Sequence, residues 1–213
     1  MFIPLGDNNP RLLNPSVVFT LMAANIIFFV LGWTIPLDNL ALWEDRFLSG
    51  SHLGFIELFT YQFVHGGWAH LLFNMFFLYI FGDNIEGAMG HGVFIVFYLL
   101  CGIGAALAEI YLDPAFGATN PGVLIGASGS VSGIMGAYIL RFPRAKVLTW
   151  IFFVFFKEIH AMYYIGIWIA LQLLSQARAA EGESVAYMAH IGGFLTGMLL
   201  YTIYRQLKMR GWL

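Results

Sequence analysis

The sequence predicts an all-α polytopic membrane protein with six transmembrane helices. Of its 213 residues, 60% are hydrophobic and only 10% are charged, whereas a soluble domain carries about 25% charged residues. The mean hydropathy is +0.77, and near-continuous apolar runs recur along the chain, at 17–31, 71–81, 93–107, 165–174 and 194–204. Because a membrane span needs about 20 mainly apolar residues, these runs mark the centres of the expected helices.

One membrane domain, residues 1–213, is expected to account for the whole chain. Its helices are predicted at about 16–35, 68–86, 92–112, 127–142, 159–176 and 187–206. Residues 1–15 carry one cation, Arg11, and no small-residue cleavage site follows the first apolar run. This pattern indicates an uncleaved first span and not a signal peptide.

Two connections are less regular than the rest. The stretch 37–67 is amphiphilic and carries Trp43, Arg46, Phe55 and Phe59, so part of it is expected in the membrane interface. The stretch 147–156 is apolar but too short to span. It is interpreted as a partial or interfacial segment, or as the start of a longer fifth span.

The basic residues predict the orientation. With six spans, both termini and the even loops share one side, and that side holds Arg11, Arg141, Arg144, Lys146, Lys157, Arg205, Lys208 and Arg210. The other side holds only Arg46 and Arg178. The positive-inside rule therefore places both termini in the cytoplasm, with the protein in the cell (inner) membrane.

Polar residues from three separate helices are expected at a similar depth below the outer face. His70 and Asn74 lie in the first two turns of the second helix, Ser128 in the first turn of the fourth, and His190 in the first turn of the sixth. The charge bias fixed the orientation without these residues, so their convergence is independent support. Ionisable side chains at such depth are costly and usually functional.

This group of residues suits hydrolysis by a serine, which needs a hydroxyl, a base and donors for the developing oxyanion. Ser128 is the candidate nucleophile, and the free N–H groups of a helix N-terminus favour negative charge beside it. His190 is the candidate base because imidazole titrates near neutral pH. His70 and Asn74 share a helix face and supply the candidate oxyanion donors. No Asp or Glu lies in these turns, so the expected arrangement is a Ser–His dyad.

Glycine spacing predicts how the two dyad helices meet. Gly129 and Gly133 are four residues apart, as are Gly193 and Gly197. Such small-xxx-small faces allow close approach of membrane helices. We therefore expect the fourth and sixth helices to pack closely enough to bring Ser128 to His190.

The remaining hydroxyls, imidazoles and the lone thiol are expected to be structural. Ser130 and Ser132 should bond the carbonyl one turn back. Cys101 is expected to pack within an apolar run, and His91 and His160 are expected to be hydrogen-bond partners. His65 is expected to support the site from just before the second helix, and His52 to lie in an exposed loop.

Three motifs resemble the rhomboid family of intramembrane serine proteases, in its bacterial form. They are "HLLFNMFFLYIFGDNIEGAMG", with His70, Asn74, Glu86 and Gly90; "GASG" at 126–129, followed by Gly133 and Gly136; and "AHIGGFLTG" at 189–197. The opening "IPLGDNNP" is also similar, and the resemblance covers essentially the whole chain. Two positions depart from the family pattern: Ile56-Glu57 stands where many members carry Trp-Arg, and Ser132 stands where an aromatic often supports the catalytic histidine.

The resemblance implies a six-helix rhomboid-like bundle with Ser128 as nucleophile and His190 as base. It implies an oxyanion site formed by His70, Asn74 and the Ser128 N–H, and a mobile cap at 176–186. It also implies transmembrane protein substrates of the single-span type, cleaved in or near their membrane segment within the lipid bilayer.

Other classes of protein fit the sequence less well. A catalytically inactive rhomboid-like module that binds membrane helices is the alternative, and such a module usually lacks the nucleophile or the base. A transporter normally places its polar residues near the midplane. No metal or other cofactor is expected, and the absence of His-Glu-x-x-His argues against a zinc membrane protease. A net charge of −2 gives no indication of nucleic-acid binding. No oligomeric state follows from these patterns.

Overall fold

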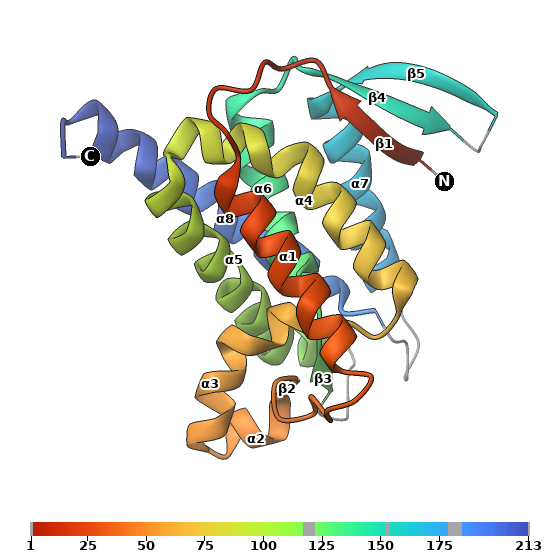
Figure 1. Ribbon diagram of the computed structural model, residues 1–213, viewed down its shortest axis with the longest axis vertical. Helices are drawn as coiled ribbons and strands as arrows, with labels where there is room; N and C mark the ends of the chain where they lie inside the picture. Colours follow the sequence, from red (N-terminus) through yellow and green to blue (C-terminus); the bar gives the residue numbers. More distant parts are fainter. Residues whose placement is uncertain (1, 117–121, 152–153, 179–184, 213) are drawn as a thin grey trace.

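The computed structural model describes residues 2–116, 122–151, 154–178 and 185–212. Its long helices are α1 (Ser16–Leu31), α4 (Trp68–Met89), α5 (His91–Leu112), α6 (Ser128–Arg141), α7 (Ala161–Gln176) and α8 (Tyr187–Met209). Each lies on one of the six predicted ranges, although α1 ends before the predicted residue 35. Figure 1 shows these helices side by side in one bundle.

A three-stranded antiparallel sheet, in the order β1–β4–β5, lies across one end of the bundle (Figure 1). It comprises β1 (Phe2–Asp7), β4 (Lys146–Ile151) and β5 (Phe155–His160). The all-α prediction is therefore wrong for these strands, and the stretch 147–156 does not start a longer fifth span. The physical reason is visible in β4, where exposed Lys146 and Leu148 alternate with buried Val147, Thr149 and Ile151. This period of two belongs to a strand that is covered on one face.

The amphiphilic connection folds at the opposite end of the bundle, below α1 and α5 in Figure 1. It contains β2 (Leu42–Trp43), α2 (Glu44–Leu48), α3 (His52–Thr60) and the 3₁₀ turn η1 (Tyr61–Phe63). β2 pairs with β3 (Val123–Leu124), and the 3₁₀ turn η2 (Asp113–Phe116) follows α5. Glu57 is fully buried here, where it forms an ion pair with Arg46 and accepts a hydrogen bond from Trp43 N at 3.2 Å.

Glu86 joins α4 to the start of α1. Its carboxylate is fully buried and accepts hydrogen bonds from Val17 N at 2.9 Å and Val18 N at 2.8 Å. A carboxylate in this position satisfies free N–H groups of the first turn and complements the helix dipole. The same carboxylate contacts the His91 ring, which confirms the structural role expected for His91.

Helix α6 is the centre of the bundle, because every residue from Gly129 to Tyr138 is buried. Its glycines lie against α8: a Cβ added at Gly193 would fall on the carbonyl oxygen of Gly129, and one at Gly197 on that of Gly133. Two helices whose backbones meet in this way have no room for side chains between them. The close approach predicted from the glycine spacing is therefore confirmed.

Within the described residues, length and composition identify few of these helices as membrane spans. The stretch His91–Phe116, with a mean hydropathy of 2.3, is long and apolar enough alone. The helical stretches His52–Phe63 and Trp68–Met89 qualify only as a pair, bent by 80° at their junction. Six spans therefore stay a prediction.

Candidate active site

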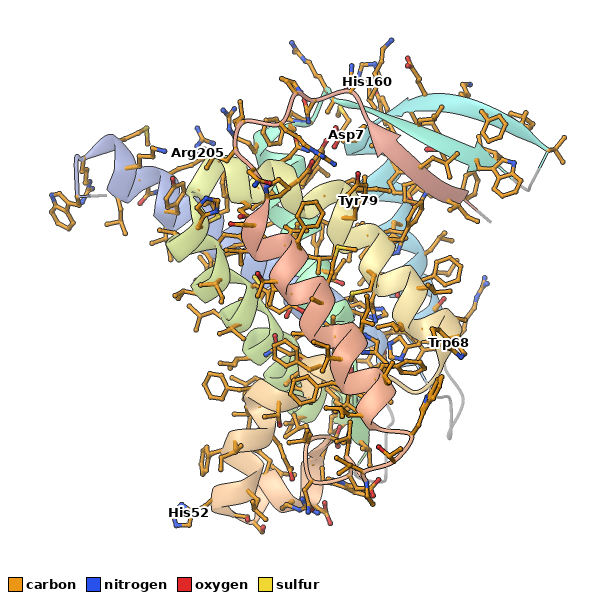
Figure 2. The ribbon with its side chains drawn as sticks, in the orientation of Figure 1. Asp7, His52, Trp68, Tyr79, His160 and Arg205 are labelled. Atoms are coloured by element: carbon orange, nitrogen blue, oxygen red, sulfur yellow. The ribbon has the colours of Figure 1, made fainter. Side chains whose placement is uncertain are left out.

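All four residues singled out by the motifs line one cavity of about 790 Å³. Ser128 begins α6, His190 lies in the first turn of α8, and His70 and Asn74 lie in the first two turns of α4. Trp68, which also lines the cavity, marks its end of the bundle in Figure 2, away from the sheet. Three helix N-terminal ends thus supply the polar part of one cavity.

Ser128 and His190 are brought together by the backbones that follow them. Gly129, directly after Ser128, touches Gly193, which is three residues after His190. Both candidate side chains are half-buried and face the same cavity. In the described part of the chain, no hydrogen bond joins the Ser128 hydroxyl to the His190 ring. Catalytic hydrogen bonds are often long in ligand-free sites and tighten only when the substrate binds.

Two residues of α7 hold the His190 ring. His190 Nδ1 lies 2.7 Å from Oε1 of Gln172, and the Trp168 ring packs against the imidazole with centroids 5.8 Å apart. Because a carboxamide oxygen only accepts, Nδ1 carries the proton in this arrangement and the lone pair is on Nε2. This tautomer corresponds to the Gln172 side chain placing its amide oxygen, and not its nitrogen, next to His190 Nδ1.

Neither of these α7 residues is predicted by the sequence motifs. Trp168 and Gln172 are four positions apart and therefore share one face of α7. A glutamine in the middle of the apolar run 165–174 was the available indication. Ser132 stands where many family members carry an aromatic residue that supports the catalytic histidine. In this chain Trp168 makes the aromatic contact to His190, so the contact comes from α7 instead of α6.

The α4 wall of the cavity offers hydrogen-bond donors. Asn74 Nδ2 is buried and has no partner among the described residues. His70 Nδ1 lies 3.5 Å from the Gly66 N–H, which leaves Nε2 as the protonated nitrogen of the neutral ring. Both side chains border Gly126, at the turn that leads into α6.

Gly126 is required at this turn for two reasons. Its φ of +107° is a conformation that residues with a side chain rarely adopt, and an added Cβ would lie 2.6 Å from His70 Cε1 and Nε2. Its N–H donates to the Tyr61 carbonyl at 2.9 Å. The first glycine of "GASG" therefore lets the backbone approach the His70 ring directly.

His65 supports the same wall from outside the helices. Its ring meets His70 edge to face with centroids 5.1 Å apart, in agreement with the expected buttress. Burial, and then the neighbouring His70 ring, lower the pKa of His65 to about 4. His65 is consequently neutral at physiological pH.

The other expectations divide into those confirmed and those corrected. Ser132 Oγ donates to the Ser128 carbonyl at 2.6 Å, as predicted. The prediction for Ser130 is wrong, because its hydroxyl donates to Gln62 Oε1 at 2.6 Å; a polar partner on a neighbouring element replaces the local carbonyl. Cys101 is buried in the core and His52 is exposed, as predicted. His160 is exposed, and its ring packs edge to face on Tyr163 instead of forming the predicted side-chain hydrogen bond with another described residue.

Two further expectations concern the cap and metals. Residues 179–184 of the expected cap lie outside the described residues. No cluster of three or more metal-binding side chains occurs within the described residues.

A family model and several known proteins that resemble this chain all point to the same family. The family model described as "Rhomboid domain" matches residues 52–207. The chain is 26% identical over 204 residues to "Putative rhomboid protease YdcA" of Bacillus subtilis, which covers 93% of this chain and 92% of that protein. It is 26% identical over 219 residues to "Rhomboid protease AarA" of Providencia stuartii, which covers 89% and 72%.

A mitochondrial relative is also similar. "Rhomboid protein 1, mitochondrial" of Saccharomyces cerevisiae is 28% identical over 194 residues, covering 86% of this chain and 52% of that protein. The chain thus spans about half the length of the yeast relative.

Proposed function

Because this chain belongs to the rhomboid family, whose members are mostly intramembrane serine proteases, we propose that it is an intramembrane serine endopeptidase. Its substrates are single-span membrane proteins, which it cleaves in or near their transmembrane segment. The observation that carries this proposal is the shared cavity, which Ser128, His190, His70 and Asn74 all line.

The chemical step uses Ser128 and His190 as a dyad. The Ser128 hydroxyl attacks the scissile carbonyl carbon while His190 Nε2 accepts the hydroxyl proton. The imidazolium then donates this proton to the departing amine, and water hydrolyses the acyl-enzyme with the histidine as base again. The contact of Gln172 with Nδ1 supports this role, because it leaves the accepting lone pair on Nε2.

The oxyanion is stabilised by donors on both sides of the carbonyl. Asn74 Nδ2 has no partner among the described residues, so it is free to donate to a developing negative charge. His70 Nε2 and the Ser128 N–H at the start of α6 are the other donors. Removing one such donor lowers turnover by about 10²–10³-fold in a comparable site.

The walls of the cavity suit an extended membrane segment. Phe73 and Phe77 of α4 and Trp168 of α7 line it beside the polar group. An unwound substrate segment can place apolar side chains on these rings while its backbone meets the polar end. Its freed N–H and carbonyl groups require such partners, because lipid offers none.

The family and the charge bias support a location in the membrane. Rhomboid proteins are membrane proteins, and we place this one in the inner membrane with both termini in the cytoplasm. The cavity then opens near the outer surface, where water for hydrolysis is available.

Labelling with a fluorophosphonate in detergent tests the nucleophile. We expect the wild-type protein to be labelled and Ser128→Ala to remain unlabelled, with equal melting temperatures as the control for folding. Labelling that persists in Ser128→Ala would remove Ser128 as the nucleophile. A folded wild type that takes no label and cuts no member of a panel of reconstituted single-span substrates would instead indicate the inactive, helix-binding module.

A further inference from the structure

A second cavity lies at the other end of the helices from the candidate active site. It measures about 470 Å³ and lies between the C-terminal parts of α4, α6 and α8. Its lining consists of Ala88, Leu140, Arg141, Tyr201, Tyr204, Arg205, Lys208 and Met209. The positions between His190 and Arg205 on α8 correspond to roughly 22 Å along the helix axis. Figure 2 shows Arg205 near the sheet end of the bundle, far from Trp68.

The rim of this cavity is strongly basic. Arg141, Arg205 and Lys208 are exposed around it, and none of the described residues that line it is acidic. The ion pairs within the described parts of the chain do not use any of these three cations. In a chain of net charge −2, three unneutralised cations at one opening form a local positive potential that attracts anions.

The floor of the cavity is polar and fixed. Tyr201 and Tyr204 are buried. The Tyr204 hydroxyl donates to the Ala88 carbonyl at 3.0 Å and accepts from Lys208 Nζ at 3.0 Å. Lys208 is thereby held over the cavity with further N–H donors left for a ligand, since an ammonium has three.

Two of these cations, Arg205 and Lys208, share one face of α8, and the third, Arg141, belongs to α6. Tyr201, Tyr204, Arg205 and Lys208 follow a spacing of three and four residues, which places them on one side of a helix. Arg141 ends α6, and its planar guanidinium binds phosphate oxygens in pairs. Cations from two helices therefore line the same cavity.

We propose that this cavity binds the phosphate group of an anionic phospholipid. Basic pockets between membrane helices on the cytoplasmic side bind acidic lipid headgroups, and the positive-inside orientation puts this end of α8 on that side. The apolar side chains of Leu140 and exposed Met209 border the cations, so an acyl chain has apolar contacts next to its headgroup. A soluble phosphate would gain nothing from these two side chains.

Native mass spectrometry of the full-length protein, released from detergent with defined lipids, tests the proposal. The probes are phosphatidylglycerol and, as the neutral reference, phosphatidylcholine. The test variant is Arg141→Gln/Arg205→Gln. The matched control is Arg144→Gln/Lys157→Gln, which removes the same charge from two exposed residues that do not line the cavity.

We expect the wild type and the control to retain phosphatidylglycerol in preference to phosphatidylcholine. The test variant should bind phosphatidylglycerol about 25-fold more weakly, because each cation near an anionic lipid is worth roughly a factor of five. Arg141→Lys/Arg205→Lys keeps the charge but loses the paired guanidinium contacts, so its binding should fall between that of the wild type and that of the test variant, which separates loss of charge from loss of fold.

Three results would overturn the proposal. Unchanged phosphatidylglycerol binding by the test variant would remove the cavity as the site. An equal loss of phosphatidylglycerol binding in the control variant would show that the lipid responds to the overall surface charge and not to a defined site. Displacement of the lipid by millimolar inorganic phosphate would show that the cavity binds a phosphate group but does not select a phospholipid.

Discussion

Replacing Gln172 by Met tests the role assigned to the α7 contact. Met has a similar length but no oxygen to accept the His190 Nδ1 proton, so the 2.7 Å hydrogen bond is lost. A neutral hydrogen bond is worth about 1 kcal/mol in the resting site, and one to a charged group about 1.5–3 kcal/mol. The imidazole becomes positively charged during attack, so the bond strengthens toward the transition state. The difference, about 0.5–2 kcal/mol, corresponds to a fall of roughly 2- to 30-fold in kcat with little change in KM.

The assay compares kcat and KM for one reconstituted single-span substrate, together with the rate of fluorophosphonate labelling. Asn25→Leu is the control, because it removes a buried amide hydrogen bond, to the Leu21 carbonyl at 2.7 Å, at a residue that does not line the cavity. Gln172→Glu should restore activity, since a carboxylate accepts the same proton. Wild-type kcat in Gln172→Met, with an active wild-type enzyme, would refute the positioning role while leaving the dyad intact. An inactive wild type would refute the proposed function itself.

Three further predictions concern the framework. Gly197→Ala should lower the free energy of unfolding by about 1–3 kcal/mol, because the added Cβ has no room against α6. The control Gly166→Ala should not lower it, since a Cβ there meets nothing within 4 Å. Equal melting temperatures of the two variants would contradict the backbone contact. Arg46→Met should destabilise by about 3 kcal/mol, because it leaves the buried Glu57 carboxylate without its cation, and Arg46→Met/Glu57→Gln should recover most of the loss. The pKa of His65 is about 4 in the folded protein and about 6.5 in the unfolded chain, so the stability of the protein should fall as the pH drops from about 6.5 to 4. In His65→Phe, the melting temperature should change less with pH across this range.

The sequence predicted the parts of the site that depend on helix periodicity. Ser128 and His190 lie at helix starts, and the glycines after them are spaced by one turn. Spacing along a helix fixes which face a residue occupies, so the contact between α6 and α8 could be predicted from the pairs Gly129 and Gly133, and Gly193 and Gly197. The common cavity then required only that the helices run in the predicted directions.

Contacts between elements distant in sequence were not accessible in this way. Gln172 and His190 meet because α7 and α8 are neighbours, and nothing in either segment specifies the rotation of α7 about its axis. The hydrogen bond from Ser130 to Gln62 has the same origin. Local rules assign a membrane hydroxyl to its own helix, and they fail where another buried group needs a partner.

The strands were missed because their apolar residues are nearly continuous. Residues 150–156 are almost all large and hydrophobic, and such a run does not distinguish a strand from a buried helix segment. The deciding partner is β1, which pairs with β4 from more than a hundred residues away. Pairing of that kind supplies the backbone hydrogen bonds that a ten-residue apolar helix would otherwise have made for itself.

The contact between α6 and α8 links the two cavities. Small residues occupy this interface from Gly129 to Gly136 on α6, and up to Gly197 on α8. Beyond them Leu140 and Tyr201 follow, and the basic cavity is found beside these larger side chains. Backbone contact at one end thus brings the Ser128 and His190 segments together, whereas larger residues at the other end leave room for a headgroup. A phospholipid bound there would hold the α6 and α8 ends at a fixed separation, so its loss should loosen the bundle first at the end away from the dyad.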